Sequence, residues 1–580
     1  MGWRRAKLDL RWTLREVRDA MAETDDPHAA FIDAALWHGP IDLAQSILAT
    51  HPEIATSDIH TAAILGDDAA VRRFLEQDPA SATAKGGPRG WDALTHLCFS
   101  KYLRLDPTRS DGFVRAATAL LDAGASPNTG FFNPEHQPRP TLESVLYGAA
   151  GVAHHPELTR LLLERGADPN DGEVAYHAPE TLDNRTVKIL VESGKLTQTS
   201  IMMMLIRKLD WHDDEGVAWL LAHGVEPNFL RQSGERPLHH ALSRGNPLAY
   251  FELLLDRGAD PRLPARDGTS AFAAAARMAR VDVLDLFERR GFSAALEGDE
   301  AFLAACARAD EATARRILAS DPSGVERLQT QNSGLLADFA GSGRTDAVRL
   351  MLDLGFDIAA GRSSPPWAAG KTALHVAAWR GLLDVVKLLI ERGAPLEATD
   401  SSGSTPLAVS LRALVEQSEW TPNEYTIEIA RALLNAGARI ESSQLTLPVA
   451  LCLGMDDAAR LAREAGAGER QVALEAVAIN GRTQAIATLI DLGVDVNAYN
   501  TQVQYHATPL HNAVCSGSLD AVRMLVEAGA RVDAKDRAYQ ATALTWAEYY
   551  LREAKANRAA KEYAAIVEYL REKEGKAASC

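Results

Sequence analysis

The sequence predicts an all-α protein, an α-solenoid built from stacked helix-turn-helix repeats with short hairpin tips. The first observation is length: 580 residues exceed what one hydrophobic core holds, so the chain forms several domains or one repeat array. The second is a 33-residue period, since the pattern that starts at Thr372 starts again at Thr405. The third is apolar residues at helical spacing within each period, which neighbouring repeats must cover.

One repeat shows why each element is expected. Thr508 can cap a first helix, and Pro509 stands where a helix tolerates a missing N–H. Gly517 separates the two helices, and Gly529 ends the second in a conformation that glycine adopts at low cost. The apolar faces of the two helices are predicted at Leu510, Ala513 and Val514, then at Val522, Met524 and Leu525.

Three segments carry a family resemblance: RPLHHALSRGNPLAYFELLLDRGADP from Arg236, TALHVAAWRGLLDVVKLLIERGAPLEATD from Thr372, and TPLHNAVCSGSLDAVRMLVEAGARVDAKD from Thr508. They resemble ankyrin repeats in the TPLH start, the inter-helix Gly, the LL pair and the GADPN-type ending. The resemblance implies about sixteen repeats over about nine-tenths of the chain. The repeats are also similar to those of soluble bacterial ankyrin proteins, and the Arg-rich, Lys-poor composition agrees with a bacterial origin.

The predicted organisation has three parts. Residues 1–28 form a charged helical lead-in and cap, residues 29–541 form the repeat array, and residues 542–580 form a capping repeat and tail. The last part has no clear glycine turn and is rich in Lys, Arg and Glu. A polar outer face on a terminal repeat keeps a solenoid soluble, which favours a capping role.

Composition excludes several function classes. With 61 basic and 78 acidic residues, a formal charge of −17 disfavours nucleic-acid binding. No apolar run approaches the roughly 18 residues that span a bilayer, so no membrane partner is predicted. The N-terminal stretch lacks the apolar core of a signal peptide, and five widely spaced cysteines with no CxxC favour reduced thiols. These observations predict a cytoplasmic protein.

Long insertions interrupt the repeat period and carry aromatic residues. One is NTGFFNPEHQPRP, with Phe131 and Phe132, and two others carry Trp367 and Trp420. Loops this long in a tight repeat are often functional. The alternative interpretation is that each aromatic ring folds back onto its neighbouring repeat.

The candidate binding residues follow from repeat register. The ankyrin resemblance implies that partners lie across an inner face formed by the first helices and the tips. There the sequence places an arginine row with interleaved tryptophans: Arg207, Trp211, Arg244, Arg277, Arg308, Trp379, Arg380 and Arg412. Arginine presents a planar fork that fits carboxylate and phosphate groups and stacks on aromatic rings. We therefore predict a non-enzymatic scaffold that binds a protein, an acidic peptide or an anionic small molecule in a central concave groove. Alternatively, each arginine pairs with a nearby Asp or Glu.

An enzyme is the second hypothesis. His177 and Glu180 are three residues apart, so on a helix they would share a face and could form an acid–base pair. Asp210 and His240 belong to the next two repeats and complete a possible site for proton transfer on an anionic substrate. The alternative is a surface His–Glu pair in a distorted repeat.

Other chemistry is not predicted. The histidines of the TPLH position are His239, His375 and His511, for which the resemblance implies structural hydrogen bonds. No HExxH motif or spaced Cys/His cluster indicates a metal site. A P-loop and a GxSxG motif are also missing, so the sequence predicts no cofactor.

Overall fold

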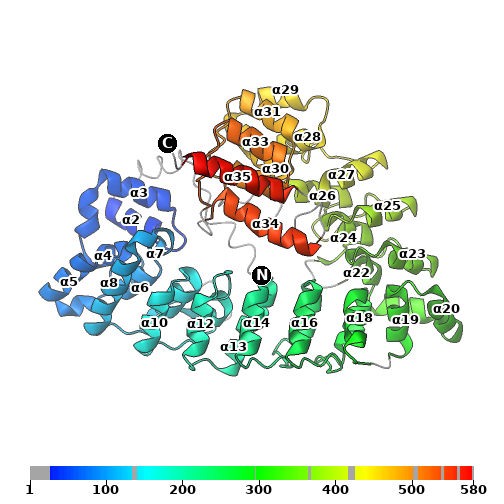
Figure 1. The fold of residues 1–580 in the computed structure, drawn as a ribbon, viewed down its shortest axis with the longest axis horizontal. Coiled ribbons are helices and arrows are strands. Elements are labelled where there is room, and N and C mark those ends of the chain that lie inside the picture. The colour runs from blue at the N-terminus through cyan, green and yellow to red at the C-terminus, as the bar shows by residue number, and fades with distance from the viewer. Residues whose placement is uncertain are drawn as a thin grey trace. The chain divides into compact units, whose positions relative to one another are not determined.

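The computed structural model describes residues 26–133, 140–293, 296–363, 368–415, 425–500, 507–536, 541–557 and 562–577. These residues are mostly helical, as predicted (Figure 1). Within them the one sheet is a two-stranded antiparallel hairpin, in which β1 (Gly130–Asn133) pairs with β2 (Thr141–Ser144). The chain divides into two compact units, here called unit 1 (Met1–Ala271) and unit 2 (Phe272–Cys580).

Unit 1 consists of short helices joined by tight turns. Its helices are α2 (Pro27–Ala35), α3 (Ile41–Thr50), α4 (Ile59–Leu65), α5 (Asp68–Gln77), α6 (Ala93–Cys98), α7 (Lys101–Leu105), α8 (Ser110–Asp122), α9 (Val145–Tyr147), α10 (Pro156–Glu164), α11 (Glu173–His177), α12 (Arg185–Glu192), α13 (Gln198–Asp210), α14 (Asp214–Ala222), α15 (Pro237–Ser243) and α16 (Leu248–Asp256). Helical turns of other types are η2 (Pro52–Thr56), η3 (Pro79–Ala82), η4 (Pro107–Arg109) and the π-helical η5 (Gly148–Val152).

Unit 2 follows the same plan. Helix α17 (Ala271–Arg277) begins at the boundary, and after it come α18 (Val281–Arg289), α19 (Gly298–Ala307), α20 (Glu311–Ser320), α21 (Gly324–Gln331), α22 (Leu335–Gly341), α23 (Thr345–Asp353), α24 (Ala373–Trp379), α25 (Leu383–Glu391), α26 (Pro406–Val415), α27 (Thr426–Asn435), α28 (Leu447–Leu453), α29 (Ala458–Glu464), α30 (Ala467–Ile479), α31 (Thr483–Asp491), α32 (Pro509–Ser516), α33 (Leu519–Glu527), α34 (Ala543–Asn557) and α35 (Tyr563–Ala577).

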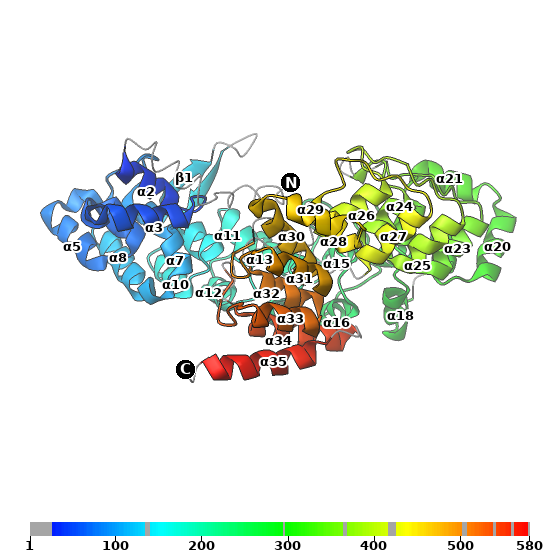
Figure 2. The same ribbon diagram turned by 90° about the horizontal axis from the view of Figure 1, so that it is seen from above.

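The helix pairs stack in two rows within each unit. In unit 1 the first helices α11, α13 and α15, labelled in Figure 2, pack one on the next, while α14 packs on α16, as labelled in Figure 1. In unit 2 the first helices α22, α24 and α26 form one row, and α23, α25 and α27 form the other. Each pair thus covers the apolar side that its neighbour exposes, which confirms the predicted solenoid packing.

The TPLH histidines have the predicted structural role. Nδ1 of His375 lies 2.9 Å from the Thr372 hydroxyl, and Nε2 donates to the Ser404 carbonyl in the next tip at 2.9 Å. His511 repeats both contacts with Thr508 and Ala541, at 2.9 and 3.1 Å. In each case the ring joins its own helix start to the following repeat.

The inter-helix turn needs a left-handed residue, and not every repeat supplies glycine there. Gly381 and Gly517 have φ of 73° and 71°. The same position is held at φ of 49° to 55° by His154, His212, Ala279 and Ala309. A left-handed non-glycine residue costs roughly 1 kcal/mol, so these four repeats carry strained turns.

The structure describes only parts of the chain ends and of the insertions, and only these parts can be compared with the predictions. Helix α2 begins at Pro27 behind the capping side chain of Asp26, and residues 1–25 of the predicted lead-in lie outside the described residues. In the first insertion, Phe131 stacks on Trp91 with ring centroids 4.1 Å apart, whereas Phe132 is 68% exposed. One ring therefore covers its neighbouring repeat and the other faces solvent. Trp367 and Trp420 lie outside the described residues.

Candidate functional site: a charge network in unit 1 and an exposed Arg/Trp face in unit 2

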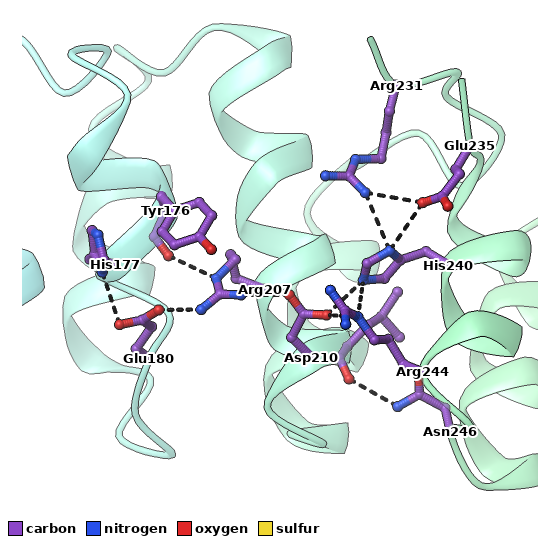
Figure 3. Close-up of polar contacts among 11 residues, drawn as sticks. Tyr176, His177, Glu180, Arg207, Asp210, Arg231, Glu235, His240, Arg244 and Asn246 are labelled. Atoms are coloured by element: carbon purple, nitrogen blue, oxygen red, sulfur yellow. Dashed lines mark hydrogen bonds and ion pairs between the residues drawn. The ribbon is translucent and has the colours of Figure 1, made fainter. Parts of the chain in front are cut away.

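The four predicted acid–base residues meet in unit 1. His177 ends α11, Asp210 ends α13, and His240 lies on α15, so successive first helices place the three side chains in one line (Figure 3). Glu180 follows α11 directly. Stacking at constant register brings together residues that lie about thirty positions apart in the chain.

The first half of this charge network joins α11 to α13. His177 contacts two carboxylates, with Nδ1 2.9 Å from Glu180 Oε2 and Nε2 3.4 Å from Glu173 Oε2. Arg207 forms an ion pair with the other oxygen of Glu180 and donates from Nε to the Tyr176 carbonyl at 3.2 Å. Its guanidinium also lies over the Tyr176 ring, 4.1 Å from the centroid.

The second half joins α13 to α15 through Asp210. One carboxylate oxygen, Oδ2, accepts from Arg207 Nη1 at 2.6 Å. The other, Oδ1, lies 2.8 Å from His240 Nε2 and 2.6 Å from Arg244 Nε. Asp210 is therefore the central anion of the network, and its side chain is only 7% exposed.

The remaining nitrogen of His240 is also engaged. Nδ1 lies 3.3 Å from Arg231 Nη1 and 3.4 Å from Glu235 Oε2, both in the tip before α15 (Figure 3). All the ring nitrogens of His177 and His240 thus face charged side chains.

The surroundings of His177, Glu180 and Asp210 favour the ionised form of each side chain. Burial disfavours the protonated form of His177, but hydrogen bonds and charge from Glu173 and Glu180 outweigh it and raise its pKa to about 9. Burial likewise acts against ionised Glu180 and Asp210. Contacts with His177 and Arg207 lower the pKa of Glu180, and contacts with His240, Arg244 and Arg207 lower the pKa of Asp210. At neutral pH, His177, Glu180 and Asp210 are therefore held as ions.

This arrangement is poorly suited to acid–base catalysis. A general base needs an accessible lone pair and a pKa near the working pH, whereas His177 keeps its proton between two carboxylates. Arg207 has a 7% exposed side chain whose donors are used within the network. The contacts instead join three repeats, and the acid–base hypothesis stays a prediction. Within the described ranges, no group of three His, Cys, Asp or Glu side chains could hold a metal ion.

Other predicted arginines also have acidic neighbours. The exposed Arg244 contacts Asp210, as described above. In unit 2, Arg308 lies 2.7 Å from Glu288, and Arg277 lies 4.0 Å from Glu300. Trp211, at the end of α13, is half-buried. Arg244, Arg277 and Arg308 therefore agree with the alternative interpretation, in which each arginine pairs with a nearby Asp or Glu.

The end of α24 in unit 2 is different. Trp379 is 42% exposed, and Arg380 is exposed beside it. Across the described part of the chain, Arg380 has no hydrogen-bond or ion-pair partner. Arg412, on the adjoining helix α26, is exposed and donates from Nη2 to the Ser404 hydroxyl at 2.6 Å. We call Trp379, Arg380 and Arg412 the Arg/Trp face.

Sequence reasoning missed two cations beside this face. Arg362 and Lys371 lie in the tip before α24, outside the helix positions from which the arginine row was read. It also missed Lys208, a fully buried ammonium 2.7 Å from Asp213. Attention to charged residues at the bases of the tips would have identified Arg362 and Lys371.

Comparison with known proteins decides the family. The model for ankyrin repeats (3 copies) matches residues 202–294, 447–536 and 474–576, and that for ankyrin repeats (many copies) matches residues 358–409. This chain is an ankyrin-repeat protein. Ankyrin repeats generally mediate binding between proteins.

Relatives of this ankyrin-repeat protein include mouse Rabankyrin-5, 31% identical over 173 residues, which are 28% of this chain and 14% of that protein. Human Ankyrin repeat and SOCS box protein 16 is 28% identical over 224 residues, 35% of this chain and 45% of its own. The chain thus matches less than half the length of either relative. The ankyrin repeat domain of human ASB11 aligns at 21% identity and a TM-score of 0.20, over 41% of this chain and 99% of that domain. The bacterial origin and the number of repeats stay predictions. In the described parts of the chain, no helix is long and apolar enough to cross a membrane.

Proposed function

We propose that this ankyrin-repeat protein is a non-enzymatic scaffold that binds an acidic segment of a partner protein on the Arg/Trp face of unit 2. The observation that carries the proposal is the exposed pair formed by Trp379 and Arg380. Tryptophan and arginine are among the residue types that most often carry the binding energy of a protein interface. Among the described residues, Arg380 has no hydrogen-bond or ion-pair partner, whereas Arg207 forms ion pairs with Glu180 and Asp210.

Charge complementarity selects the partner. The whole chain carries −17, which repels acidic partners at long range, so an acidic segment must be attracted locally. Arg380 and Arg412 supply that attraction from two adjoining helices, α24 and α26. An anionic small molecule would also bind through Arg380 and Arg412. We propose the exposed Phe132 of unit 1 as a separate protein contact.

The cytoplasm is the proposed location. The four described cysteines, Cys98, Cys306, Cys452 and Cys515, are all buried free thiols. Burial raises the pKa of Cys306 and of Cys452 to about 12, which keeps these thiols protonated and unreactive. Such thiols suit a reducing compartment.

Fluorescence anisotropy with labelled peptide pools tests the proposal. One degenerate pool carries a central run of glutamates, and a second pool of equal length carries lysines. We expect the full chain to bind the glutamate pool, more weakly as salt is raised, and the double variant Trp379→Ala/Arg380→Ala to bind at least about tenfold more weakly.

The matched control is Arg277→Ala, which removes an exposed arginine from the end of another first helix of unit 2, α17, next to Glu300. It is expected to bind as the unsubstituted chain does. Equal binding of the two pools, or undiminished binding by the double variant, would show that the Arg/Trp face is not the docking surface.

A further inference from the structure

Two buried histidines of unit 1 lie next to each other under the tip that precedes α6. His60 of α4 and His96 of α6 have ring centroids 5.0 Å apart, and their exposed fractions are 7% and 0%. The tip Gly86–Trp91 is closed by its own hydrogen bond, in which the Gly86 amide donates to the Trp91 carbonyl at 2.9 Å. We call His60 and His96 the histidine pair.

The tip lies directly on the histidine pair because glycine lines the contact. A methyl group added at Gly86 would overlap His60 Nε2, and one added at Gly87 would lie 3.3 Å from His96 Nε2. The ring of Trp91, at the end of the tip, has its centroid 5.6 Å from that of His96. The tip and the two rings therefore close over one another.

The histidine pair is built for neutral rings. Nδ1 of His96 donates to the Asp92 carbonyl at 2.9 Å, whereas its Nε2 is buried without a hydrogen-bond partner among the residues that the structure describes. Nδ1 of His60 is also buried without a partner there. Protonation places an N–H on each of these atoms, and a buried N–H without an acceptor is unfavourable. Two imidazolium ions at this separation would also repel each other.

The carboxylates nearest to the pair are already hydrogen-bonded. At the start of α4, Asp58 accepts from the Thr61 amide at 2.7 Å and lies 2.9 Å from Nε2 of His28, on α2. At the start of α6, Asp92 accepts from the amide and the hydroxyl of Thr95, at 2.9 and 2.8 Å. These contacts cap the two helices, so neither carboxylate turns toward the buried ring nitrogens without opening a helix start.

Charged side chains of the neighbouring elements pair with partners of their own. Arg89 of the tip lies 2.7 Å from Asp33 of α2. Asp68 of α5 lies 3.0 Å from Arg115 of α8, and Lys101 of α7 donates to a backbone carbonyl in the turn before α3. The tip is thus fastened by an exposed ion pair on one side and rests on the histidine pair on the other.

We propose that the histidine pair is a proton-sensitive latch, which holds the tip Gly86–Trp91 on unit 1 while both rings are neutral and releases it when they take up protons. The latch acts whether or not unit 2 binds an acidic segment. It is closed at neutral pH and opens on acidification.

The titration of the pair gives the pH range. Burial lowers the pKa of His60, and burial together with the charge of His60 lowers the pKa of His96 to about 4. Asp58 and Asp92 act in the opposite direction without outweighing burial. A freely exposed histidine titrates at about 6.5, so the closed tip has its full stability above that pH and loses it as pH falls from 6.5 toward 4.

Release of the tip reaches the hairpin of the first insertion. Phe131 of β1 stacks on Trp91, with ring centroids 4.1 Å apart. When the tip leaves, β1 loses the surface on which Phe131 lies. The latch thereby couples acidification to the position of the exposed Phe132 on the same strand.

Hydrogen exchange followed by mass spectrometry at pH 7 and at pH 5 tests the latch in the full chain, with protection factors corrected for the intrinsic effect of pH. We expect protection in the tip Gly86–Trp91 and at the start of α6 to fall at least about tenfold at pH 5, since a pKa of about 4 in the closed form against 6.5 in the open form favours opening by at least that factor. Peptides that cover β1 should lose protection with them.

Two variants assign the effect to the pair. His96→Leu removes the fully buried ring, and His60→Leu/His96→Leu removes both. We expect the loss of protection at pH 5 to be smaller in the first and missing in the second. The matched control is His51→Leu, which removes an exposed histidine of unit 1 that lies 3.3 Å from Glu53, and it should lose protection as the unsubstituted chain does. Circular dichroism melting curves at pH 7 verify that the three variants remain folded.

Unit 2 is an internal reference that needs no substitution. Both ring nitrogens of His375 and of His511 have hydrogen-bond partners, so α24 and α32 should keep their protection at pH 5. An equal loss in these helices would indicate general acid unfolding and overturn the latch. Unchanged protection of the tip at pH 5, or a loss that persists in the double variant, would overturn it as well.

Discussion

Arg207 in unit 1 and Arg380 in unit 2 come from the same part of the repeat, the end of a first helix, yet their surroundings are opposite. The Arg207 side chain is 7% exposed and lies between Glu180 and Asp210. Arg380 is exposed beside Trp379, with no ion-pair partner among the described residues. The difference comes from the nearby carboxylates: Glu180 of the preceding repeat and Asp210 of its own helix pair with Arg207, whereas Asp338 of α22, the helix that Arg380 lies against, pairs with Arg362. An arginine near the end of a first helix is therefore structural or available for binding according to its neighbours.

The largest expected effect comes from removing the buried cation. Arg207→Met leaves Glu180 and Asp210 with fewer counter-ions in a partly buried place, so we expect the free energy of unfolding to fall by about 3 kcal/mol. Arg380→Met leaves no buried charge behind and should change it by less than about 0.5 kcal/mol. Urea denaturation followed by circular dichroism measures both. Equal losses in the two variants would contradict the contrast between the two sites.

The network should also show in the pH dependence of stability. The pKa of His177 is raised from 6.5 to about 9 in the folded chain, so its protonated form stabilises the fold fully below pH 6.5. That contribution is lost as pH rises from 6.5 through 9, and it amounts to about 3 kcal/mol. We expect His177→Gln to be less stable than the unsubstituted chain at pH 6 and to approach it near pH 9.5. A stability difference that stays constant between these pH values would show that His177 is not held as an ion.

The smallest expected effect concerns the turns, which both units share. Ala279 takes the left-handed inter-helix position that Gly381 occupies in another repeat, with φ of 51°. Ala279→Gly relieves this strain but gives the unfolded chain more freedom, so we expect a net stabilisation of about 0.5 kcal/mol. The control Ala274→Gly, inside α17, should destabilise by about 1 kcal/mol. Thermal melting measures both, and a loss of stability in Ala279→Gly would contradict the assigned strain.

The repeat pattern allowed much of the fold to be predicted. The 33-residue period, the glycine between helices and the TPLH start are local features, and the structure confirms the helix stack and the hydrogen bonds of His375 and His511. The sequence did not show which aromatic residue of the first insertion is buried and which is exposed. Phe131 and Phe132 are adjacent in sequence, and alternation along β1 sends one toward Trp91 and the other into solvent.

The sequence by itself determined the ankyrin fold family and the stacked helix pairs with their glycine turns. These depend on spacing along the chain, which a period of identical units makes visible. Only the tertiary structure decided which charged side chains neutralise each other. Ion pairing depends on distances of a few ångströms between side chains from different repeats, and it is those distances that close the contacts around Asp210 while leaving Arg380 exposed.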